Sequence, residues 1–336
     1  MVSAAPQQSV TCEICGSHNV TLFDAAERMY GLGGSFAYVN CQDCRTIYQK
    51  DKLDDYSKFY PQNYYSFDLK KLDKHSLKQS FRIFKKRSRD SYYFFKSGLI
   101  GKLLSLFRDE TTTHVSRHIS FNRNMFILDV GCGAGEYIYD MAEVGFKHVY
   151  GLDPFVAESK NFDNGTKIYR GDIEKFLNEN PYQVNGFDLI IFNHSFEHSP
   201  QPLKELELAM KLLKPEGKIL VRIPVSASYA ADTYGEYWFQ LDAPRHIYLF
   251  NEKSMAILAD KVGLKIDKVY YDSIESQFWA SEQYKLGIPL LAENSYARSR
   301  KNSIFSRAQM RHFKKETRRL NTIGLGDQAG FILSAK

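Results

Sequence analysis

The chain has 336 residues, of which 43% are hydrophobic and 25% charged, and its formal net charge is +6. This is the composition of a globular protein, and it excludes wholesale disorder. The positive charge suits an anionic ligand, such as a phosphorylated or nucleotide-linked compound, without requiring nucleic acid.

The first ten residues contain neither a basic stretch nor an apolar core, so no secretory signal is expected. The best candidate for a membrane segment, residues 93–107, is interrupted by Lys96 and Lys102. It is also shorter than the ~20 apolar residues that a spanning helix needs. We expect an amphipathic helix there that packs on its own protein. The sequence therefore predicts a cytoplasmic protein without a membrane span.

Four of the five cysteines form two CxxC pairs, Cys12 with Cys15 and Cys41 with Cys44. In a reducing compartment, clustered pairs indicate a metal site before a disulfide. Two such pairs can close a tetrahedral zinc site with Zn–S bonds of ~2.3 Å. We expect a zinc ribbon whose hairpin occupies residues 20–40. Because four thiolates leave no open coordination position, this zinc would stabilise the module and not react.

Three regions of the chain differ in composition and pattern. Residues 1–50 form the expected zinc module, and residues 51–122, rich in Tyr, Phe, Lys and Arg, are expected to form a helical linker or a cap over the substrate. In residues 123–336, strand-like and helix-like segments alternate. This alternation predicts an α/β fold with a parallel sheet that helices cover on both faces.

Short apolar runs in the third region predict seven strands, because strands that are buried on both faces read as continuous hydrophobic segments. The expected strands are 125–130, 148–153, 167–172, 187–193, 218–224, 265–272 and 329–335. The expected helices between the first five strands are 137–143, 155–161, 173–180 and 201–213.

The first of these strands runs into a turn with glycines at 131, 133 and 135. Glycines let the backbone turn sharply and approach a ligand closely. The third glycine comes one residue earlier than in the G-x-G-x-x-G turn that cradles a pyrophosphate. An acid, Asp129, precedes the first glycine. S-adenosylmethionine carries an ammonium and a sulfonium but no phosphate, so a carboxylate at this turn favours it electrostatically.

Polar residues at the next strand ends are candidates for the same cofactor site. Asp153 is placed to accept hydrogen bonds from two ribose hydroxyls. Asp172 and the backbone N–H of Ile173 are candidates for the adenine amino group and a ring nitrogen, and Asn193 is expected nearest the methyl-donor end. Since Asp is common after strands, Asp172 is equally readable as an ordinary turn residue.

Residues 126–224 resemble the core of class I S-adenosylmethionine-dependent methyltransferases. The matching motifs are ILDVGCGAGE, GLDP, GDIE, FDLIIFNHSFEH and LLKPEGKILVRIP. The resemblance implies a Rossmann-like, seven-stranded mixed sheet in which the last strand is antiparallel and lies beside the fifth. It also implies that the glycine turn holds the methionine end of the cofactor and that the acid after the second strand holds the ribose.

Methyl transfer is a direct displacement that usually requires removal of a proton from the acceptor. Glu197 and His198, just after the fourth strand, are candidates for the base, although the pair is also interpretable as a feature of fold and cofactor packing. After the fifth strand, Arg245 suits a phosphate or carboxylate on the acceptor, and His246 is a further candidate base. The alternative for this loop is an Asp–Arg–His network that holds its conformation.

The four-cysteine module, an NYYSF segment at 63–67 and this core together resemble methyltransferases that act on sugars in polysaccharide and antibiotic-sugar pathways. This resemblance implies that Tyr64 or Tyr65 lines the active site with Glu197 and His198. It implies a sugar or glycan precursor as the acceptor, nucleotide-linked sugars included. The zinc-bearing sugar C-methyltransferases have a further C-terminal domain, whereas this chain ends at its seventh expected strand. We therefore expect methylation of an oxygen as readily as methylation of a carbon.

Two other function classes compete with this interpretation. An RNA methyltransferase would use the basic and aromatic stretches at 81–89 and 298–319 to hold RNA. A net charge of +6 is modest for that role, so a nucleic-acid partner is not expected. The other alternative is a cofactor-binding scaffold without catalysis, which the intact glycine turn does not exclude.

Overall fold

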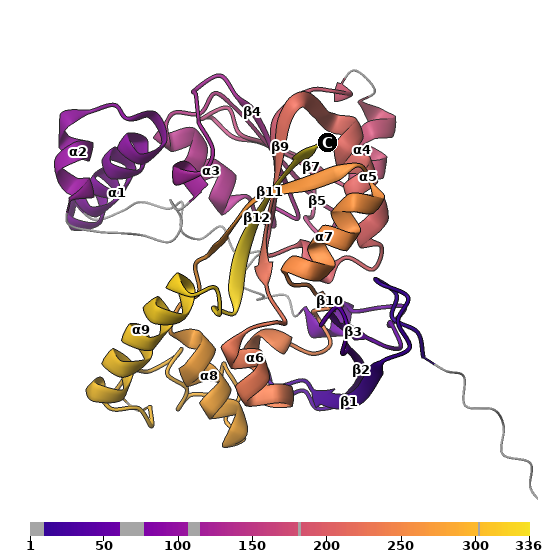
Figure 1. Ribbon diagram of the computed structural model, residues 1–336. Coiled ribbons are helices and arrows are strands. Elements are labelled where there is room, and N and C mark those ends of the chain that lie inside the picture. The colour runs from indigo at the N-terminus through magenta and orange to yellow at the C-terminus, as the bar shows by residue number, and fades with distance from the viewer. Residues whose placement is uncertain (1–9, 61–76, 107–114, 181–182, 302) are drawn as a thin grey trace, which may run out of the picture.

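The structure is a computed structural model that places residues 10–60, 77–106, 115–180, 183–301 and 303–336 (Figure 1). A large sheet with helices on both faces forms the centre of the molecule, and a small sheet near the N-terminus lies against one end of it.

The large sheet has eight strands within the described residues, in the order β11-β12-β9-β8-β4-β5-β7-β6. Strands β4, β5, β7, β8 and β9 run parallel, whereas β12 is antiparallel and lies between β9 and β11. The strands are β4 (Phe126–Val130), β5 (His148–Asp153), β6 (Lys160–Asn161), β7 (Lys167–Arg170), β8 (Phe187–Asn193), β9 (Leu213–Pro224), β11 (Leu264–Tyr271) and β12 (Gln328–Ala335). All seven predicted strands are confirmed, and so is the mixed, Rossmann-like order.

The centre of the sheet is buried on both faces, as the continuous apolar runs predict. In β8, Leu189 and Ile191 belong to one core cluster, and Ile190 and Phe192 belong to the other. This alternation follows from the two-residue period of a strand. The helices that follow these strands are α3 (Glu136–Val144), α4 (Ile173–Glu179), α5 (Pro202–Leu212) and α7 (Glu252–Lys261).

The predicted helix at 155–161 is wrong. Turns follow β5 there, and residues 160–161 form the short edge strand β6. Phe155 is largely exposed and Val156 is only partly buried, so the segment has no apolar stripe to pack against the sheet. A two-residue strand shows no periodicity, which is why the sequence did not predict β6.

The small sheet has the order β1-β2-β3-β10. Strands β1 (Val20–Ala26) and β2 (Ser35–Cys41) form the hairpin expected for a ribbon, and β3 (Ile47–Gln49) follows. The fourth strand, β10 (Tyr248–Leu249), comes from the C-terminal part of the chain and pairs with β3. The cysteine module and the α/β part therefore share one sheet.

The remaining helices lie at the ends of the large sheet. They are α1 (Leu77–Phe95), α2 (Leu99–Ser105), α6 (Tyr229–Tyr234), α8 (Ser276–Lys285) and α9 (Arg307–Thr322), with single turns of 3₁₀-helix η1 (Ser57–Phe59), η6 (Phe196–His198), η7 (Gly235–Tyr237) and η8 (Phe239–Leu241). Among the placed residues, no helix is long and apolar enough to cross a membrane.

The expectation that residues 93–107 pack on their own protein is only partly correct. Phe94 is buried beside Phe121 and Phe146, but Leu99, Ile100, Leu103 and Leu106 are largely exposed. Helix α1 ends at Phe95, and α2 contacts α1 through Gly101. A Cβ atom at Gly101 would come within 2.2 Å of the Ser88 carbonyl oxygen. The apolar side chains of α2 thus point away from that contact.

Candidate cofactor and acceptor site

The turn after β4 has the conformation and the close contacts that require glycine. The φ angles of Gly131, Gly133 and Gly135 are 75°, 54° and 85°, in the left-handed region. A Cβ atom on Gly131 would lie 2.4 Å from Ser195 Cβ, and one on Gly135 would lie 2.4 Å from Ile168 Cδ1. The turn therefore brings the backbone against neighbouring strand ends before α3 begins.

Asp129 lies directly before this turn and is only 3% exposed. Its Oδ1 has no hydrogen-bond partner among the placed residues. Burial raises the pKa of Asp129 well above its usual range, and the nearby Asp153 carboxylate raises it further. A buried carboxylate oxygen without a partner is costly, and an ammonium group would supply both the missing hydrogen bond and the opposite charge. Asp129 thus fits the amino-acid end of S-adenosylmethionine.

Asp153, at the end of β5, is held by the glycine turn. Its Oδ2 accepts a hydrogen bond from the Gly133 N–H at 2.8 Å, and its Oδ1 accepts one from the Phe155 N–H at 2.8 Å. Burial raises the pKa of Asp153, although these N–H donors act in the opposite direction. Each carboxylate oxygen has a second lone pair, so both remain able to accept from ribose hydroxyls.

The other two polar strand ends are engaged within the protein. Asp172 caps α4, because its Oδ1 accepts from the Lys175 N–H at 2.8 Å. This is the ordinary turn role that the sequence left open, and it leaves Oδ2 and the Ile173 N–H for a ligand. Asn193 Oδ1 accepts from Arg222 Nη1 at 3.1 Å, which fixes the amide at the end of β8.

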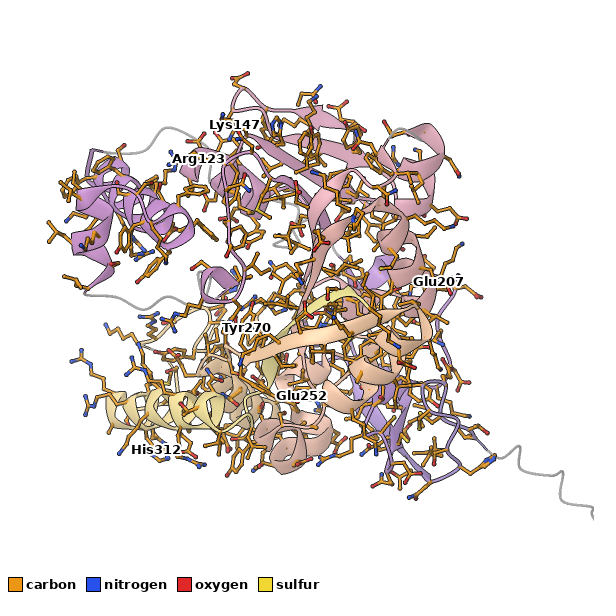
Figure 2. All side chains as sticks on the ribbon, turned by 45° about the horizontal axis from the view of Figure 1, so that its top comes forward. Arg123, Lys147, Glu207, Glu252, Tyr270 and His312 are labelled. Carbon is orange, nitrogen blue, oxygen red and sulfur yellow. The ribbon has the colours of Figure 1, made fainter. Side chains whose placement is uncertain are left out.

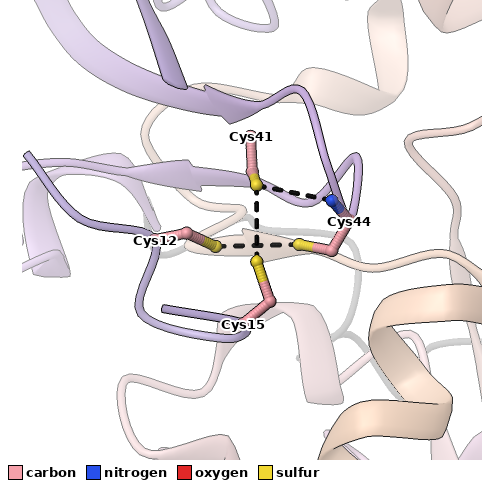
Figure 3. Close-up of side chains that lie close together, drawn as sticks. All are labelled: Cys12, Cys15, Cys41 and Cys44. Atoms are coloured by element: carbon pink, nitrogen blue, oxygen red, sulfur yellow. Dashed lines mark hydrogen bonds between the residues drawn. The ribbon is translucent and has the colours of Figure 1, made fainter. Parts of the chain in front are cut away.

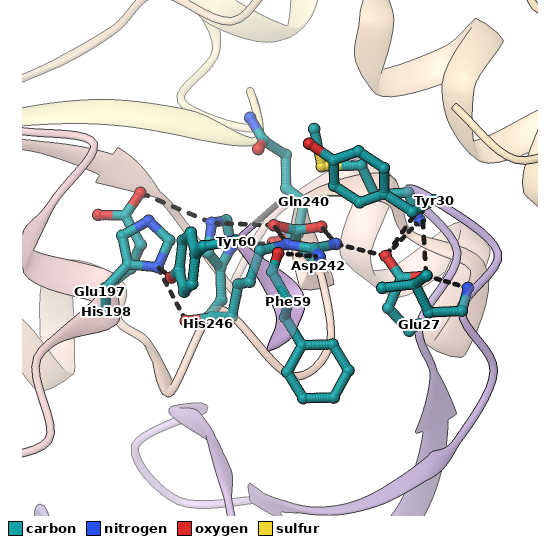
Figure 4. A network of polar contacts seen from close by, with 12 residues as sticks. Glu27, Tyr30, Phe59, Tyr60, Glu197, His198, Gln240, Asp242 and His246 are labelled. Carbon is teal, nitrogen blue, oxygen red and sulfur yellow. Dashed lines mark hydrogen bonds and ion pairs between the residues drawn. The ribbon is translucent and has the colours of Figure 1, made fainter. Parts of the chain in front are cut away.

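A carboxylate and two imidazoles lie close together in the loops after β8 and before β10 (Figure 4). Glu197 and His198 lie on η6, just after β8, whereas His246 lies just before β10. One ligand-type atom from each of the three groups lies within 4.8 Å of the others. His246 Nε2 is 3.9 Å from Glu197 Oε1. The fold thus brings together the candidate bases from two loops that are far apart in the sequence.

Backbone carbonyls fix the orientation of both imidazoles. His198 Nδ1 lies 2.8 Å from the Arg245 carbonyl oxygen, and His246 Nδ1 lies 2.6 Å from that of Gln240. A carbonyl oxygen only accepts, so each Nδ1 carries the proton and donates it. In the neutral rings, Nε2 is then the nitrogen with the free lone pair.

Glu197 is fully buried, and neither of its carboxylate oxygens accepts a hydrogen bond from a placed residue. Burial would raise the pKa of Glu197, but His194, His198 and His246 outweigh it and lower the pKa to about 2. Burial lowers the pKa of His198, although the Glu197 charge opposes this. The cluster therefore combines an ionised carboxylate with an imidazole that is neutral at pH 7.

Of the two roles that the sequence left open for Arg245, the structure shows the one in an ion-pair network that holds its loop, and not contact with an acceptor. It is 1% exposed, and its guanidinium is paired with Asp242 at 2.6 Å and with Glu27 at 2.8 Å. It also donates to the Phe59 carbonyl oxygen at 3.2 Å. Because these donors are used inside the protein, Arg245 holds the loop and the module together and does not face an acceptor.

Two residues of this site were not predicted from the sequence. Glu27 lies between β1 and β2 and accepts hydrogen bonds from three backbone N–H groups as well as from Arg245. The Tyr60 hydroxyl lies 3.2 Å from His198 Nδ1, and its ring stacks on that of Phe155. No local pattern marks either residue as part of this site, since Arg245 and His198, the partners that connect them to it, are distant in the sequence. The predicted Tyr65, with Tyr64, lies outside the described residues.

The four cysteines of the module converge on one point (Figure 3). The Sγ atoms of Cys12 and Cys44 are 3.6 Å apart, as are those of Cys15 and Cys41, and all four lie within 4.8 Å of one another. Zn–S bonds of ~2.3 Å in a tetrahedron place sulfurs about 3.8 Å apart. The donor set and its spacing therefore fit zinc.

Comparison with known proteins agrees with this geometry. Residues 106–269 match a protein family described as "Methyltransferase domain". The matched stretch is similar to methyltransferase domains and makes up just under half of the chain. It contains the glycine turn, Asp129, Asp153 and the Glu197–His198 pair, while the cysteine module lies outside it.

Two curated relatives are each similar to a third of the chain or less. A tRNA U34 carboxymethyltransferase of Nautilia profundicola is 30% identical over 110 residues, which are 32% of this chain and 36% of that protein. A ubiquinone biosynthesis O-methyltransferase of Vibrio cholerae is 34% identical over 100 residues, 28% of this chain and 39% of that protein. The chain thus spans little more than a third of the length of these relatives.

A solved structure of a SAM-dependent methyltransferase from Archaeoglobus fulgidus is also similar. It is 20% identical with a TM-score of 0.41, over 71% of this chain and 100% of that one.

Proposed function

We propose that the protein transfers a methyl group from S-adenosylmethionine to a small-molecule acceptor, a sugar or glycan precursor. One observation carries this proposal. Asp129, whose buried Oδ1 has no hydrogen-bond partner among the placed residues, precedes the turn, and Ser195, two residues before Glu197, lies against the same turn. Ser195 donates to the Val130 carbonyl oxygen at 2.5 Å and lies next to Gly131, and Glu197 forms the cluster with His198 and His246. A binding site for a cationic cofactor is thus next to groups that accept protons.

The residues of the cofactor end have separate roles in this proposal. Asp129 binds the ammonium group, and the turn from Gly131 to Gly135 lets the backbone approach the methionine moiety. Asp153 accepts from the ribose hydroxyls through the lone pairs that the Gly133 and Phe155 amides leave free. Asp172 Oδ2 and the Ile173 N–H contact the adenine, and Asn193 lies at the methyl-donor end.

When bound, S-adenosylmethionine supplies an electrophilic methyl group and a neutral thioether as leaving group. The acceptor proton passes to the free Nε2 of His198 or His246, and the Glu197 carboxylate stabilises the imidazolium that forms. The carbonyls of Arg245 and Gln240 keep both rings in the required orientation. General-base catalysis of this kind contributes about 10²–10⁴-fold to a rate. Tyr65 is proposed to line the acceptor pocket, as the resemblance to sugar methyltransferases implies.

Zinc is proposed as the second bound group. Cys12, Cys15, Cys41 and Cys44 would hold it as four thiolates. Such a closed site has no position for a substrate, so its contribution is to the folding of the module.

RNA is the second candidate acceptor. A tRNA U34 carboxymethyltransferase is similar to 32% of the chain, and residues 298–319 carry nine Lys or Arg and one Glu. Sugar acceptors are favoured by the combination of the four-cysteine module with the Glu197–His198 pair.

The test is methyl transfer from S-adenosylmethionine labelled in its methyl group. The purified protein is incubated separately with pooled nucleotide sugars, with glycan precursors and with tRNA, and the labelled product is identified by chromatography. We expect label in a sugar fraction, with His198→Gln and His246→Gln together lowering the rate about 100-fold or more. Label in tRNA alone would transfer the proposal to RNA, and label in none of the fractions would contradict it.

A further inference from the structure

The hairpin of α1 and α2 presents a row of large apolar side chains to solvent. Leu99 is 82% exposed and Leu103 is 62% exposed. The other members of the row are Phe81, Phe84, Ile100 and Leu106, and each is more than half exposed. The close contact at Gly101 turns the opposite side of α2 toward α1, which is why the exposed leucines of α2 remain outside. Six such residues within one helical hairpin are more than scattered surface hydrophobics.

The same hairpin carries positive charge without an exposed acid. Residues 77–106 contain a single acidic residue, Asp90, which is buried and paired with Arg89 at 2.9 Å. Arg82, Lys85 and Lys102 are exposed. The surface therefore combines bulky apolar groups with cations, as interfacial amphipathic helices do.

A second basic surface lies on α9 and the segment before it. Residues 298–319 hold nine Lys or Arg and one Glu, whereas the whole chain has an excess of only six positive charges. The remainder of the chain is thus slightly acidic. Figures 1 and 2 show α9, with His312 on it, and the α1–α2 hairpin projecting on the same side of the molecule. The exposed cations of α9 are Arg307, Arg311, Lys314, Lys315, Arg318 and Arg319, the last of which is paired with Glu316.

We infer that the α1–α2 hairpin and α9 together dock the protein on an anionic lipid bilayer. The leucine and phenylalanine side chains of the hairpin enter the boundary between head groups and acyl chains, and the cations of both elements contact the anionic head groups. The protein lies on this surface and does not span it, in agreement with the lack of a spanning helix among the placed residues.

Charge complementarity favours this occupant over the two others. A second copy of the chain in a two-fold interface would place the same cationic face against itself. Nucleic acid would engage the cations and could stack bases on Phe81 and Phe84, but the leucines and the isoleucine of α2 gain nothing against a phosphate backbone. An anionic bilayer satisfies the apolar and the basic side chains at once. This inference does not depend on the identity of the methyl acceptor.

The experiment is flotation of the full-length protein with lipid vesicles. Vesicles of phosphatidylcholine with phosphatidylglycerol are compared with vesicles of phosphatidylcholine alone, at low and at high salt. We expect the protein to float with the anionic vesicles at low salt and to be released at high salt, because surface charges are screened.

Two pairs of substitutions separate the apolar and the basic contributions. Leu99→Ser with Leu103→Ser, and Arg311→Glu with Lys315→Glu, should each lower the partition coefficient by about tenfold or more, since each cation near an anionic surface contributes about fivefold. Matched controls are Leu22→Ser with Leu32→Ser on the module, and Lys265→Glu with Lys268→Glu on β11, whose side chains are also exposed. Affinity for S-adenosylhomocysteine and the circular dichroism spectrum report whether each variant is folded.

Three results would overturn the inference. The first is failure of the native protein to float with anionic vesicles, and the second is flotation of the Leu99–Leu103 variant at the native level. The third is a native dimer, seen by light scattering, that this variant converts to a monomer, because the apolar row would then belong to a second copy. Loss of flotation in both test pairs with retention in both controls would support it.

Discussion

Replacing Arg245 tests whether this residue holds the structure or binds the acceptor. Its guanidinium is buried and forms ion pairs with Asp242 and Glu27, which come from different parts of the chain. In Arg245→Met, both carboxylates stay buried without their partner. Breaking a buried ion pair in this way costs about 3–5 kcal/mol. For a protein of this size, that corresponds to a fall in Tm on the order of 10 °C.

The assay is thermal and denaturant unfolding, with steady-state kinetics of the same samples. Arg28→Met is the matched control, because Arg28 lies one residue from Glu27 but forms a partly exposed pair with Glu236 at 3.6 Å. Such pairs contribute about 0–1 kcal/mol, so the control should unfold close to the native protein. Glu27→Gln should cost less in the Arg245→Met background than alone, since the two share one interaction. An Arg245→Met protein with native stability and a raised KM for the acceptor would refute the structural role.

Three further predictions concern the turn, the base and the metal. Gly131→Ala should weaken S-adenosylhomocysteine binding by more than about tenfold, because the new Cβ overlaps Ser195. Gly165→Ala, where the Cβ meets open space, should leave the affinity unchanged. Calorimetry that finds equal affinities for the two variants would count against the turn geometry. Burial lowers the pKa of His198, so this base stays neutral below pH 6.5 and the rate should fall only as the pH drops through that lowered pKa. An acidic limb of the pH–rate profile centred at or above pH 6.5 would be inconsistent with His198 as the base. Metal analysis should find one zinc per chain in the native protein and none in Cys44→Ser, with a lower Tm for the variant; a native protein without zinc would exclude the proposed site.

The sequence predicted the structure best where a single strand or turn fixes the local conformation by itself. The apolar runs located seven strands because strands buried on both faces read as continuous hydrophobic segments, and the resemblance to methyltransferases predicted that the last strand, β12, is antiparallel and lies beside β9. The glycine turn was recognisable because positive φ angles and close contacts exclude other residues at 131 and 135. The segment 155–161 was assigned wrongly because its apolar residues never meet the sheet.

Contacts between segments that are distant in the sequence could not be predicted from local sequence patterns. The pairing of β3 with β10 and the Arg245–Glu27 ion pair join the cysteine module to the loop before β10. Tyr60 reaches His198 across the same junction. Candidate residues could be named from strand ends, but whether Arg245 faces an acceptor or another carboxylate depends on how the module packs. Asp172 shows the same ambiguity on a smaller scale, because a helix cap and a ligand contact use the same side chain.

The most direct test of the cofactor site is calorimetric titration with S-adenosylhomocysteine, for the native protein and for Asp129→Asn. The substitution preserves shape but removes the carboxyl group that would ionise beside the ammonium, whereas Asp260→Asn, at an exposed position on α7, serves as control. We expect micromolar binding, equal to about −8 kcal/mol, for the native protein and the control, and an affinity at least about tenfold lower for Asp129→Asn. Undetectable binding to the native protein, or equal binding to Asp129→Asn, would contradict the assignment of this turn as the cofactor site.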